Sequence, residues 1–275
     1  MMTSANMMTS AKKKAGTSHY RAFTLTELLV VVTVMGLLAA LLLPSLTKAK
    51  KEAQSLACLA NLKQLQLCCH LYSQDNNDAL VPNQSGGYVS SIQTTNKPQS
   101  IANPQSWCPG LAPLDTTTAN VAAGLIFSYN RTPLLYHCPA DLSTVSGNPT
   151  LPRTRSYCMD ICLNCSSALR PYHKLSEMQE PGPSDTFVLI DTQEQDIFDA
   201  TFGIFSPESH WAGYWLDLAA DRHNQGANLS FADGHVEFWR WRAPKIFRGV
   251  FALAQSPADL TDLQRLEACV RPDGN

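Results

Sequence analysis

The sequence predicts an α+β fold in which one long N-terminal helix packs on a globular head built around an antiparallel sheet. Three observations predict it: an apolar run over 23–43, a helical pattern that continues to about residue 75, and a hairpin pattern near residue 230. The chain has 275 residues. At roughly 100–200 residues per domain, this length allows one large domain or two small ones.

The composition excludes several classes of protein. Charged residues make up 16% of the chain, hydrophobic residues make up 44%, and the formal net charge is -2. A chain this apolar is not an intrinsically disordered acidic or basic protein. The near-zero net charge also gives no electrostatic footprint for nucleic acid, so no nucleic-acid partner is expected.

The apolar run predicts a single membrane span. Residues 1–22 contain four Lys and Arg side chains and no acid, and the run over 23–43 carries one charge, Glu27. About 20 apolar residues span a hydrocarbon core of roughly 30 Å. Because the basic flank stays in the cytoplasm, the residues after Pro44 are expected outside the inner membrane. A cleaved secretory signal peptide is the alternative, but residues 45–54 continue as helix-forming sequence.

The segment Ala22-Phe-Thr-Leu-Thr-Glu27, followed by an apolar helix, resembles the class III signal of type IV pilins and type II secretion pseudopilins. The resemblance implies that prepilin peptidase cleaves between Ala22 and Phe23 and N-methylates Phe23. It also implies that Glu27 neutralises the N-terminus of a neighbouring subunit during assembly. The family usually has Gly before the cleaved bond, whereas this chain has Ala22.

The expected organisation has four parts. Residues 1–22 are the cleaved leader, and residues 23–43 form the transmembrane and assembly helix. Residues 44–75 form the amphipathic, extracytoplasmic half of the same helix. Residues 76–275 form the α+β region that we call the head.

The second half of the helix carries one apolar face. Cys58, Leu62, Leu65, Cys69 and Tyr72 recur at steps of four, three, four and three residues, which is the spacing of one helix face. We therefore expect the head to cover this face. The turn-forming residues 75–78 should end the helix.

Three further elements are predicted in the head. Residues 187–190, followed by Asp191, predict a short buried strand, and residues 256–270 predict a terminal helix. Residues 227–241 predict a hairpin with a two-residue turn at Asp233-Gly234. That turn pairs Phe231 with Val236 and predicts that the apolar face of the hairpin lies against the long helix.

The hairpin carries a second resemblance. His223, nine further residues and then Asp233-Gly234 resemble the H-x9-DG element of large pilin-like proteins abundant in Planctomycetes and Verrucomicrobia. This places the element at 223–241, near the end of the chain.

Oxygen ligands near the hairpin suggest a calcium site. Pseudopilins commonly bind Ca²⁺ in a C-terminal loop, and Asp221, Asn224 and Asp233 could supply part of the six to eight oxygens that Ca²⁺ needs. The alternative is that Asp233 is only a turn residue and that His223 hydrogen-bonds a loop.

A cluster of cysteines allows either zinc or disulfides. Cys158, Cys162 and Cys165 have C-x3-C-x2-C spacing, with His137 and Cys138 upstream, and zinc takes four such ligands. A location outside the cytoplasm favours disulfides among these cysteines.

Cys58 faces the head and is a candidate disulfide partner for Cys138, which would join the helix to the head. Nine cysteines is an odd number, so at least one thiol is unpaired or pairs between chains.

The sequence favours a structural subunit over an enzyme. It contains no G-x-S-x-G, H-E-x-x-H or P-loop motif. The expected partners are the membrane, other pilin-like subunits in a filament, prepilin peptidase, and the secretion or pilus assembly machinery. The alternatives are a membrane-anchored extracytoplasmic metal-dependent hydrolase, and an envelope protein that uses the pilin pathway only for export.

Overall fold

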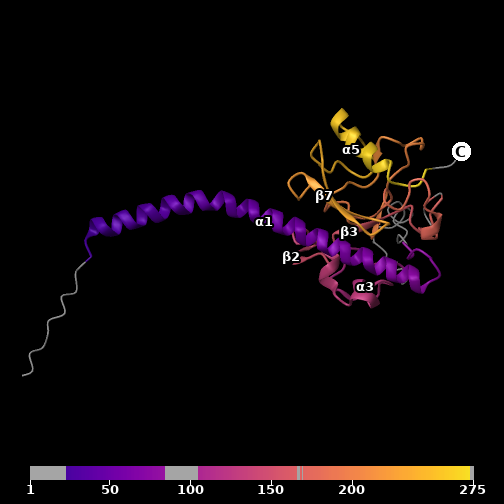
Figure 1. Ribbon diagram of the computed structural model, residues 1–275, viewed down its shortest axis with the longest axis horizontal. Coiled ribbons are helices and arrows are strands. Elements are labelled where there is room, and N and C mark those ends of the chain that lie inside the picture. The colour runs from indigo at the N-terminus through magenta and orange to yellow at the C-terminus, as the bar shows by residue number, and fades with distance from the viewer. Residues whose placement is uncertain (1–22, 84–104, 166–167, 169, 273–275) are drawn as a thin grey trace, which may run out of the picture. The chain divides into compact units, whose positions relative to one another are not determined.

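The computed structural model describes residues 23–83, 105–165, 168 and 170–272 (Figure 1). Residues 1–22, with Ala22 and the predicted leader, lie outside the described residues. The chain divides into two compact units, Met1–Thr47 and Lys48–Asn275. The second unit contains the head and the part of the long helix that the head covers.

The long helix α1 runs from Leu25 to Asp75 and continues through Pro44 without interruption. Every residue from 23 to 53 is exposed, including the whole apolar run. The helix ends where the turn residues begin, because Asn77 and Asp78 have positive φ values of 54° and 67°. Asn and Asp tolerate this left-handed conformation better than most residues, so they stop the helix at low cost.

The apolar face predicted for the second half of α1 is confirmed. Cys58, Leu62 and Leu65 are fully buried, Cys69 is almost fully buried, and Tyr72 packs against the same core from a partly buried position. The head thus covers this face along about four turns of the helix.

The head is built on a five-stranded sheet with the strand order β5-β3-β4-β7-β8. Strands β3 and β5 pair in parallel, and the other neighbours pair antiparallel. The α+β fold is confirmed, and the buried strand expected at 187–190 is the central strand β4. The five strands are β3 (Tyr157–Asp160), β4 (Phe187–Asp191), β5 (Thr201–Phe202), β7 (Gly226–Phe231) and β8 (Val236–Arg240).

Smaller elements surround the sheet. Two short two-stranded sheets pair β1 with β2 and β6 with β9. They are accompanied by helices α3 (Ala119–Ala122), α4 (Phe127–Asn130) and α5 (Pro257–Glu267), 3-10 helices η1 (Pro133–Tyr136) and η2 (Leu175–Glu177), and strands β1 (Thr144–Val145), β2 (Asn148–Pro152), β6 (Tyr214–Trp215) and β9 (Ala252–Leu253).

Two apolar clusters form the core. The first joins the buried face of α1 to residues of β3 and β4, and the second joins β4, β7 and β8 to α5. The terminal helix is confirmed as α5, and the hydroxyl of Ser256 caps its first turn by accepting a hydrogen bond from the backbone N–H of Asp259 at 3.1 Å. Such a cap satisfies one of the N–H groups that a helix leaves without a partner.

The hairpin at 223–241 forms, but the predicted register was wrong by one residue. Val236 pairs with Ser230 and not with Phe231. The reason is a three-residue loop: Gly234 donates to the carbonyl of Phe231 at 2.9 Å with φ of 98°, and Phe231 then pairs with His235 through a 3.0 Å bond. A type I turn closed by a glycine with positive φ is the usual three-residue hairpin loop.

The shifted register turns the side chains of β8 over relative to those of β7, since side chains alternate along a strand. Leu229 and Phe231 pack in the cluster that includes α5. Ser230 and Val236 lie on the other side: the Ser230 hydroxyl donates to the Gln66 side chain at 3.1 Å, and Val236 packs against the cluster that contains the buried face of α1. The prediction that Leu229 and Phe231 lie against α1 together with Val236 was therefore wrong.

Candidate functional site

The N-terminal end of α1 is closed by Thr24 and Glu27. The backbone N–H and the hydroxyl of Thr24 donate to Oε2 of Glu27 at 2.9 and 2.6 Å, and the N–H of Glu27 donates to the Thr24 hydroxyl at 3.3 Å. This reciprocal arrangement is a capping box. It holds the Glu27 carboxylate within the first turn of a helix whose surrounding side chains are apolar and exposed.

A second group of chemically active side chains lies inside the head. Among the residues that the structure describes, one group of four could hold a metal ion: Cys58, Cys138, Asp191 and His223. Cys58 lies on α1, Cys138 follows η1, Asp191 ends β4, and His223 precedes β7. All four are buried, and His223 is the most accessible at 3% exposed.

The ligand atoms of these four residues all lie within 4.8 Å of one another. Nε2 of His223 is 3.2 Å from Sγ of Cys138 and 3.2 Å from Oδ2 of Asp191. Sγ of Cys58 is 3.9 Å from the same Asp191 oxygen. We call these four residues the buried cluster.

The buried cluster perturbs the acid–base behaviour of its members. Burial favours neutral His223, but its hydrogen bonds to Asp191 and Cys138 outweigh this and raise its pKa to about 9. The hydrogen bond between the two thiols, helped by His223, lowers the pKa of Cys138 to about 7 against the effect of burial. Burial raises the pKa of Cys58. The cluster therefore pairs an imidazole with a raised pKa and a thiol with a lowered pKa.

Neighbouring polar groups hold the cluster in place. The Arg222 guanidinium donates to Oδ1 of Asp191 at 3.0 Å, which leaves Oδ2 directed at the other three residues. The Tyr157 hydroxyl donates to Sγ of Cys58 at 3.2 Å. Arg222 also lies 3.3 Å from Asp141, so its charge is compensated twice. Outer contacts of this kind fix the orientation of ligand side chains.

The structure does not bring the three predicted calcium ligands into one shell. Asp221 and Asn224 precede β7, whereas Asp233 follows it. The six residues of β7, at about 3.3 Å each, separate the two groups by roughly 20 Å. Asp221 accepts from the backbone N–H of Lys245 at 3.0 Å, and Asp233 accepts from that of His235 at 3.0 Å. Both carboxylates thus have local structural roles.

The predicted cysteine set is divided between two places. Cys158 lies in β3, and its thiol points to the carbonyl of Asp199 at 3.5 Å. Cys162 and Cys165 lie in the segment after that strand, and Cys165 is buried. Cys138 belongs to the buried cluster and faces Cys58, the partner that the sequence suggested for it.

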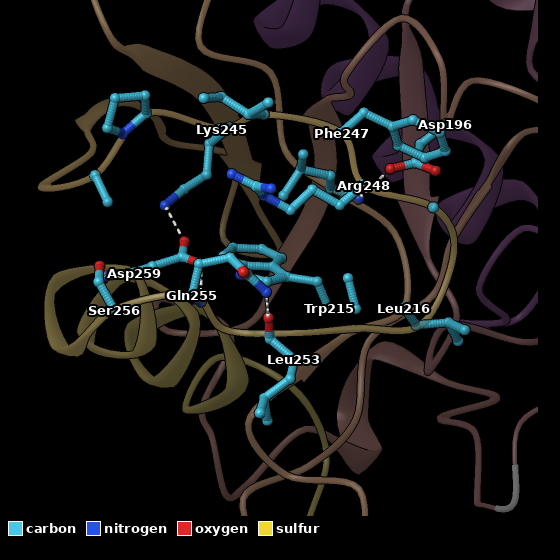
Figure 2. A pocket seen from close by; sticks show the side chains of 16 residues that line it. Asp196, Trp215, Leu216, Lys245, Phe247, Arg248, Leu253, Gln255, Ser256 and Asp259 are labelled. Carbon is cyan, nitrogen blue, oxygen red and sulfur yellow. Dashed lines mark hydrogen bonds and ion pairs between the residues drawn. The ribbon is translucent and has the colours of Figure 1, made fainter.

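Figure 2 shows a separate pocket of about 190 Å³ beside α5. Its main charged group is Lys245, which points toward Asp259 and donates to it at 2.8 Å. Lys245 also donates to Asp262 at 2.8 Å and lies over the rings of Trp215 and Trp241. Because the charge of Lys245 is compensated by these two carboxylates, this side chain stabilises the fold beside α5 and is not available to bind a charged ligand.

Sequence reasoning noted each member of the buried cluster and suggested Cys58 as a disulfide partner for Cys138, but it did not join all four. Their positions are far apart in the chain, and metal motifs are recognised by short, regular spacing. The sequence did carry a signal for two members of the cluster. His223 begins the H-x9-DG element of the head, and Cys58 lies on the face of α1 that the head covers, so both could have been expected where the head meets the helix.

The N-terminal segment matches a family model. The model is described as a prokaryotic N-terminal methylation motif, and it matches residues 17–43. These residues include the bond between Ala22 and Phe23, the capping box at Glu27, and the apolar run. One helix of the described residues, α1, is long and apolar enough to cross a membrane.

The chain is also similar to curated proteins. It is 31% identical over 87 residues to the type II secretion system core protein G of Escherichia coli (strain K12), covering 32% of this chain and 59% of that protein. It is 34% identical over 84 residues to the competence protein ComGC of Halalkalibacterium halodurans, covering 28% of this chain and 79% of that protein. It is 39% identical over 57 residues to the type IV wide pilus major component PilA4 of Thermus thermophilus, covering 21% of this chain and 44% of that protein.

The chain thus spans more than half the length of protein G and about four fifths of the length of ComGC. No solved structure matches the chain. The methylation motif, the long apolar helix and these relatives agree, and the chain belongs to the superfamily of type IV pilins and type II secretion pseudopilins.

Proposed function

We propose that this protein is a structural subunit of a type II secretion pseudopilus or a type IV pilus-like filament. Prepilin peptidase cleaves it between Ala22 and Phe23 and methylates the new N-terminus at Phe23. The single observation that carries the proposal is the first half of α1, an exposed apolar helix with one carboxylate, Glu27, at its start.

Two physical arguments support this function. First, the apolar side chains of 25–43 are exposed, and such a surface is stable only in a membrane or against other apolar helices. Second, a carboxylate at the start of an apolar span is costly unless it has a partner. The capping bonds use Oε2 of Glu27. In a filament, the remaining oxygen can accept from the N-terminal ammonium group of a neighbouring subunit.

The proposal includes a location and a set of partners. The subunit is stored in the inner membrane as a single-pass protein, with its N-terminus in the cytoplasm and its head outside. Its partners are further pilin-like subunits, the prepilin peptidase and the assembly machinery. The apolar stretch 25–43 forms the helix contacts of the filament, and the head covers the second half of α1.

Substitution of Glu27 tests the proposal. In Glu27→Leu, the span becomes more apolar, so membrane insertion should match the wild type while the protein disappears from sheared filaments. Glu52→Gln is the matched control, because Glu52 lies on the same helix in an exposed ion pair with Lys48 at 3.9 Å. The control should assemble normally.

Two outcomes would contradict the proposal. Normal filaments in Glu27→Leu would remove the assembly role of the carboxylate. Absence of the wild-type protein from every sheared filament fraction, with the protein present in the membrane, would favour an envelope protein that uses the pathway only for export.

A further inference from the structure

The buried cluster brings four metal-binding side chains together in the core of the head. A tetrahedral zinc has ligands at about 2.3 Å for sulfur and about 2.0 Å for nitrogen or oxygen, so the ligand atoms themselves lie about 3.3 to 3.8 Å apart. The observed separations are 3.2 Å from Cys138 to His223, 3.2 Å from His223 to Asp191, and 3.9 Å from Cys58 to Asp191. These three separations fall close to that range, and the other three are at most 4.8 Å, so small side-chain adjustments would complete a tetrahedron.

Hydrogen bonds alone explain this convergence less well. Nε2 of His223 can carry one proton, yet it lies equally close to the Cys138 sulfur and the Asp191 oxygen. The two thiols and Nε2 of His223 supply at most three protons to these four groups. A divalent ion would replace those protons with four direct bonds, one to each group.

A divalent ion would also compensate most of the charge at this position. Two thiolates, the Asp191 carboxylate and Asp141, which lies 3.3 Å from Arg222, carry four negative charges, and neutral His223 carries none. A divalent cation and the Arg222 guanidinium, which bonds the outer oxygen of Asp191 at 3.0 Å, supply three positive charges. The site then keeps one net negative charge, against three for the same ligands without the ion, and this lowers the cost of burying it.

We propose that Cys58, Cys138, Asp191 and His223 bind one structural zinc ion that joins helix α1 to the head. Two thiolates, one imidazole and one carboxylate are the ligand types that Zn²⁺ takes in proteins. Binding forms two Zn–S bonds, one Zn–N bond and one Zn–O bond and releases to solvent the protons that the two thiols and Nε2 of His223 carried, so no oxidant or reductant is needed. Because all four positions are filled by the protein, no position is open for a substrate, and the ion is structural.

The ion would link segments that are distant in the sequence. It joins α1, the segment after η1, the end of β4 and the start of the H-x9-DG element. His223 then has a structural role as the first residue of that element, because it fixes the N-terminal end of β7 against α1. This proposal does not depend on filament assembly, since it concerns the stability of the head.

The test uses the full chain, exported and extracted from membranes in detergent without chelator or reductant. Elemental analysis should find one zinc per chain. X-ray absorption at the zinc edge should show two sulfur ligands at about 2.3 Å and two nitrogen or oxygen ligands at about 2.0 Å. Both measurements use the wild type, so they do not depend on a variant that folds.

Variants then assign the ligands. Cys138→Ser and His223→Ala should each lower the zinc content at least tenfold after dialysis, whereas Cys269→Ser should retain one equivalent. Cys269 is a suitable control because it lies outside the cluster and its thiol points to the carbonyl of Arg265. After replacement by Co²⁺, the wild type and the control should show an intense sulfur-to-cobalt charge-transfer band, and the two ligand variants should not.

Three results would overturn the proposal. The first is a chain without zinc in which both Cys58 and Cys138 are reduced. The second is a disulfide between Cys58 and Cys138 in a non-reducing peptide map. The third is bound zinc whose content is unchanged in both ligand variants.

Discussion

The side chain of Lys63 on α1 donates a hydrogen bond from Nζ to the carbonyl oxygen of Gly234, at 2.6 Å, in the turn between β7 and β8. The Asp233-Gly234 turn is the far end of the H-x9-DG element, whose His223 lies in the buried cluster beside Cys58. The element therefore contacts α1 at both of its ends, through His223 at one end of β7 and through the turn at the other.

Removal of the Lys63 bond should weaken the attachment of the hairpin. Lys63→Met keeps the aliphatic part of the side chain but removes the donor, and a single such bond contributes about 1 kcal/mol. We expect the free energy of unfolding of the full chain in detergent, measured by denaturant titration, to fall by this amount. Lys51→Met, on the exposed part of α1, is the control and should leave it unchanged. Equal free energies of unfolding for Lys63→Met and Lys51→Met would show that the contact between Lys63 and Gly234 does not stabilise the protein.

Removal of the buried cation beside α5 should lower the free energy of unfolding much more. Lys245 is buried and bonds Asp259 and Asp262 at 2.8 Å each. Lys245→Met leaves two buried carboxylates without their cation, and breaking such a pair costs about 3–5 kcal/mol. The exposed pair of Lys48 and Glu52, at 3.9 Å, provides the matched control. Lys48→Met should cost at most about 1 kcal/mol, and a Lys245→Met protein as stable as this control would refute the prediction.

Asp160 should make the stability of the head depend on pH. It is fully buried in β3; its Oδ1 accepts from the backbone N–H of Cys162 at 2.9 Å, and among the described residues its Oδ2 has no hydrogen-bond partner. Burial raises the pKa of Asp160 to about 7, whereas the unfolded chain releases this proton near pH 4. The folded state thus binds the extra proton between these values. The stabilisation that this proton gives the folded state is fully present below about pH 4. It is lost as the pH rises to about 7, and the free energy of unfolding falls by at most about 1.4 kcal/mol per pH unit.

The neutral variant Asp160→Asn should remove that dependence. Its stability relative to the wild type should be greater at pH 8 than at pH 5, measured by denaturant titration at both values. The exposed Asp185→Asn is the control and should shift both values equally. If Asp160→Asn follows the wild type at both pH values, the buried carboxyl does not hold its proton in the folded state.

The sequence predicted those elements whose signal is local. The face of α1 from Cys58 to Tyr72, the strand β4 and the helix α5 all follow from periodicity or from capping residues, which act within a few positions. The hairpin at 223–241 was also predicted, but its register was not. Two-residue and three-residue loops both accept Asp233-Gly234, and the choice depends on the packing of β7 between α1 and α5.

The buried cluster could not be predicted for a different reason. Cys58, Cys138, Asp191 and His223 come from four separate segments, and their convergence is a property of the tertiary fold. The cysteines at 158, 162 and 165 have the more regular spacing, yet β3 and the following segment direct Cys158 away from the cluster, toward Asp199. Regular spacing directed the zinc alternative to Cys158, Cys162 and Cys165, with His137 and Cys138 upstream, and of these five Cys138 belongs to the buried cluster.

The central claim is that this chain is processed and assembled as a pilin-like subunit, and N-terminal mass spectrometry of the membrane-extracted protein tests it most directly. We predict that the chain begins at Phe23 and carries one additional methyl group on its α-amino nitrogen, and that both features disappear in cells without prepilin peptidase. A protein that retains residues 1–22, or one cleaved after the apolar run at 23–43, would contradict the account.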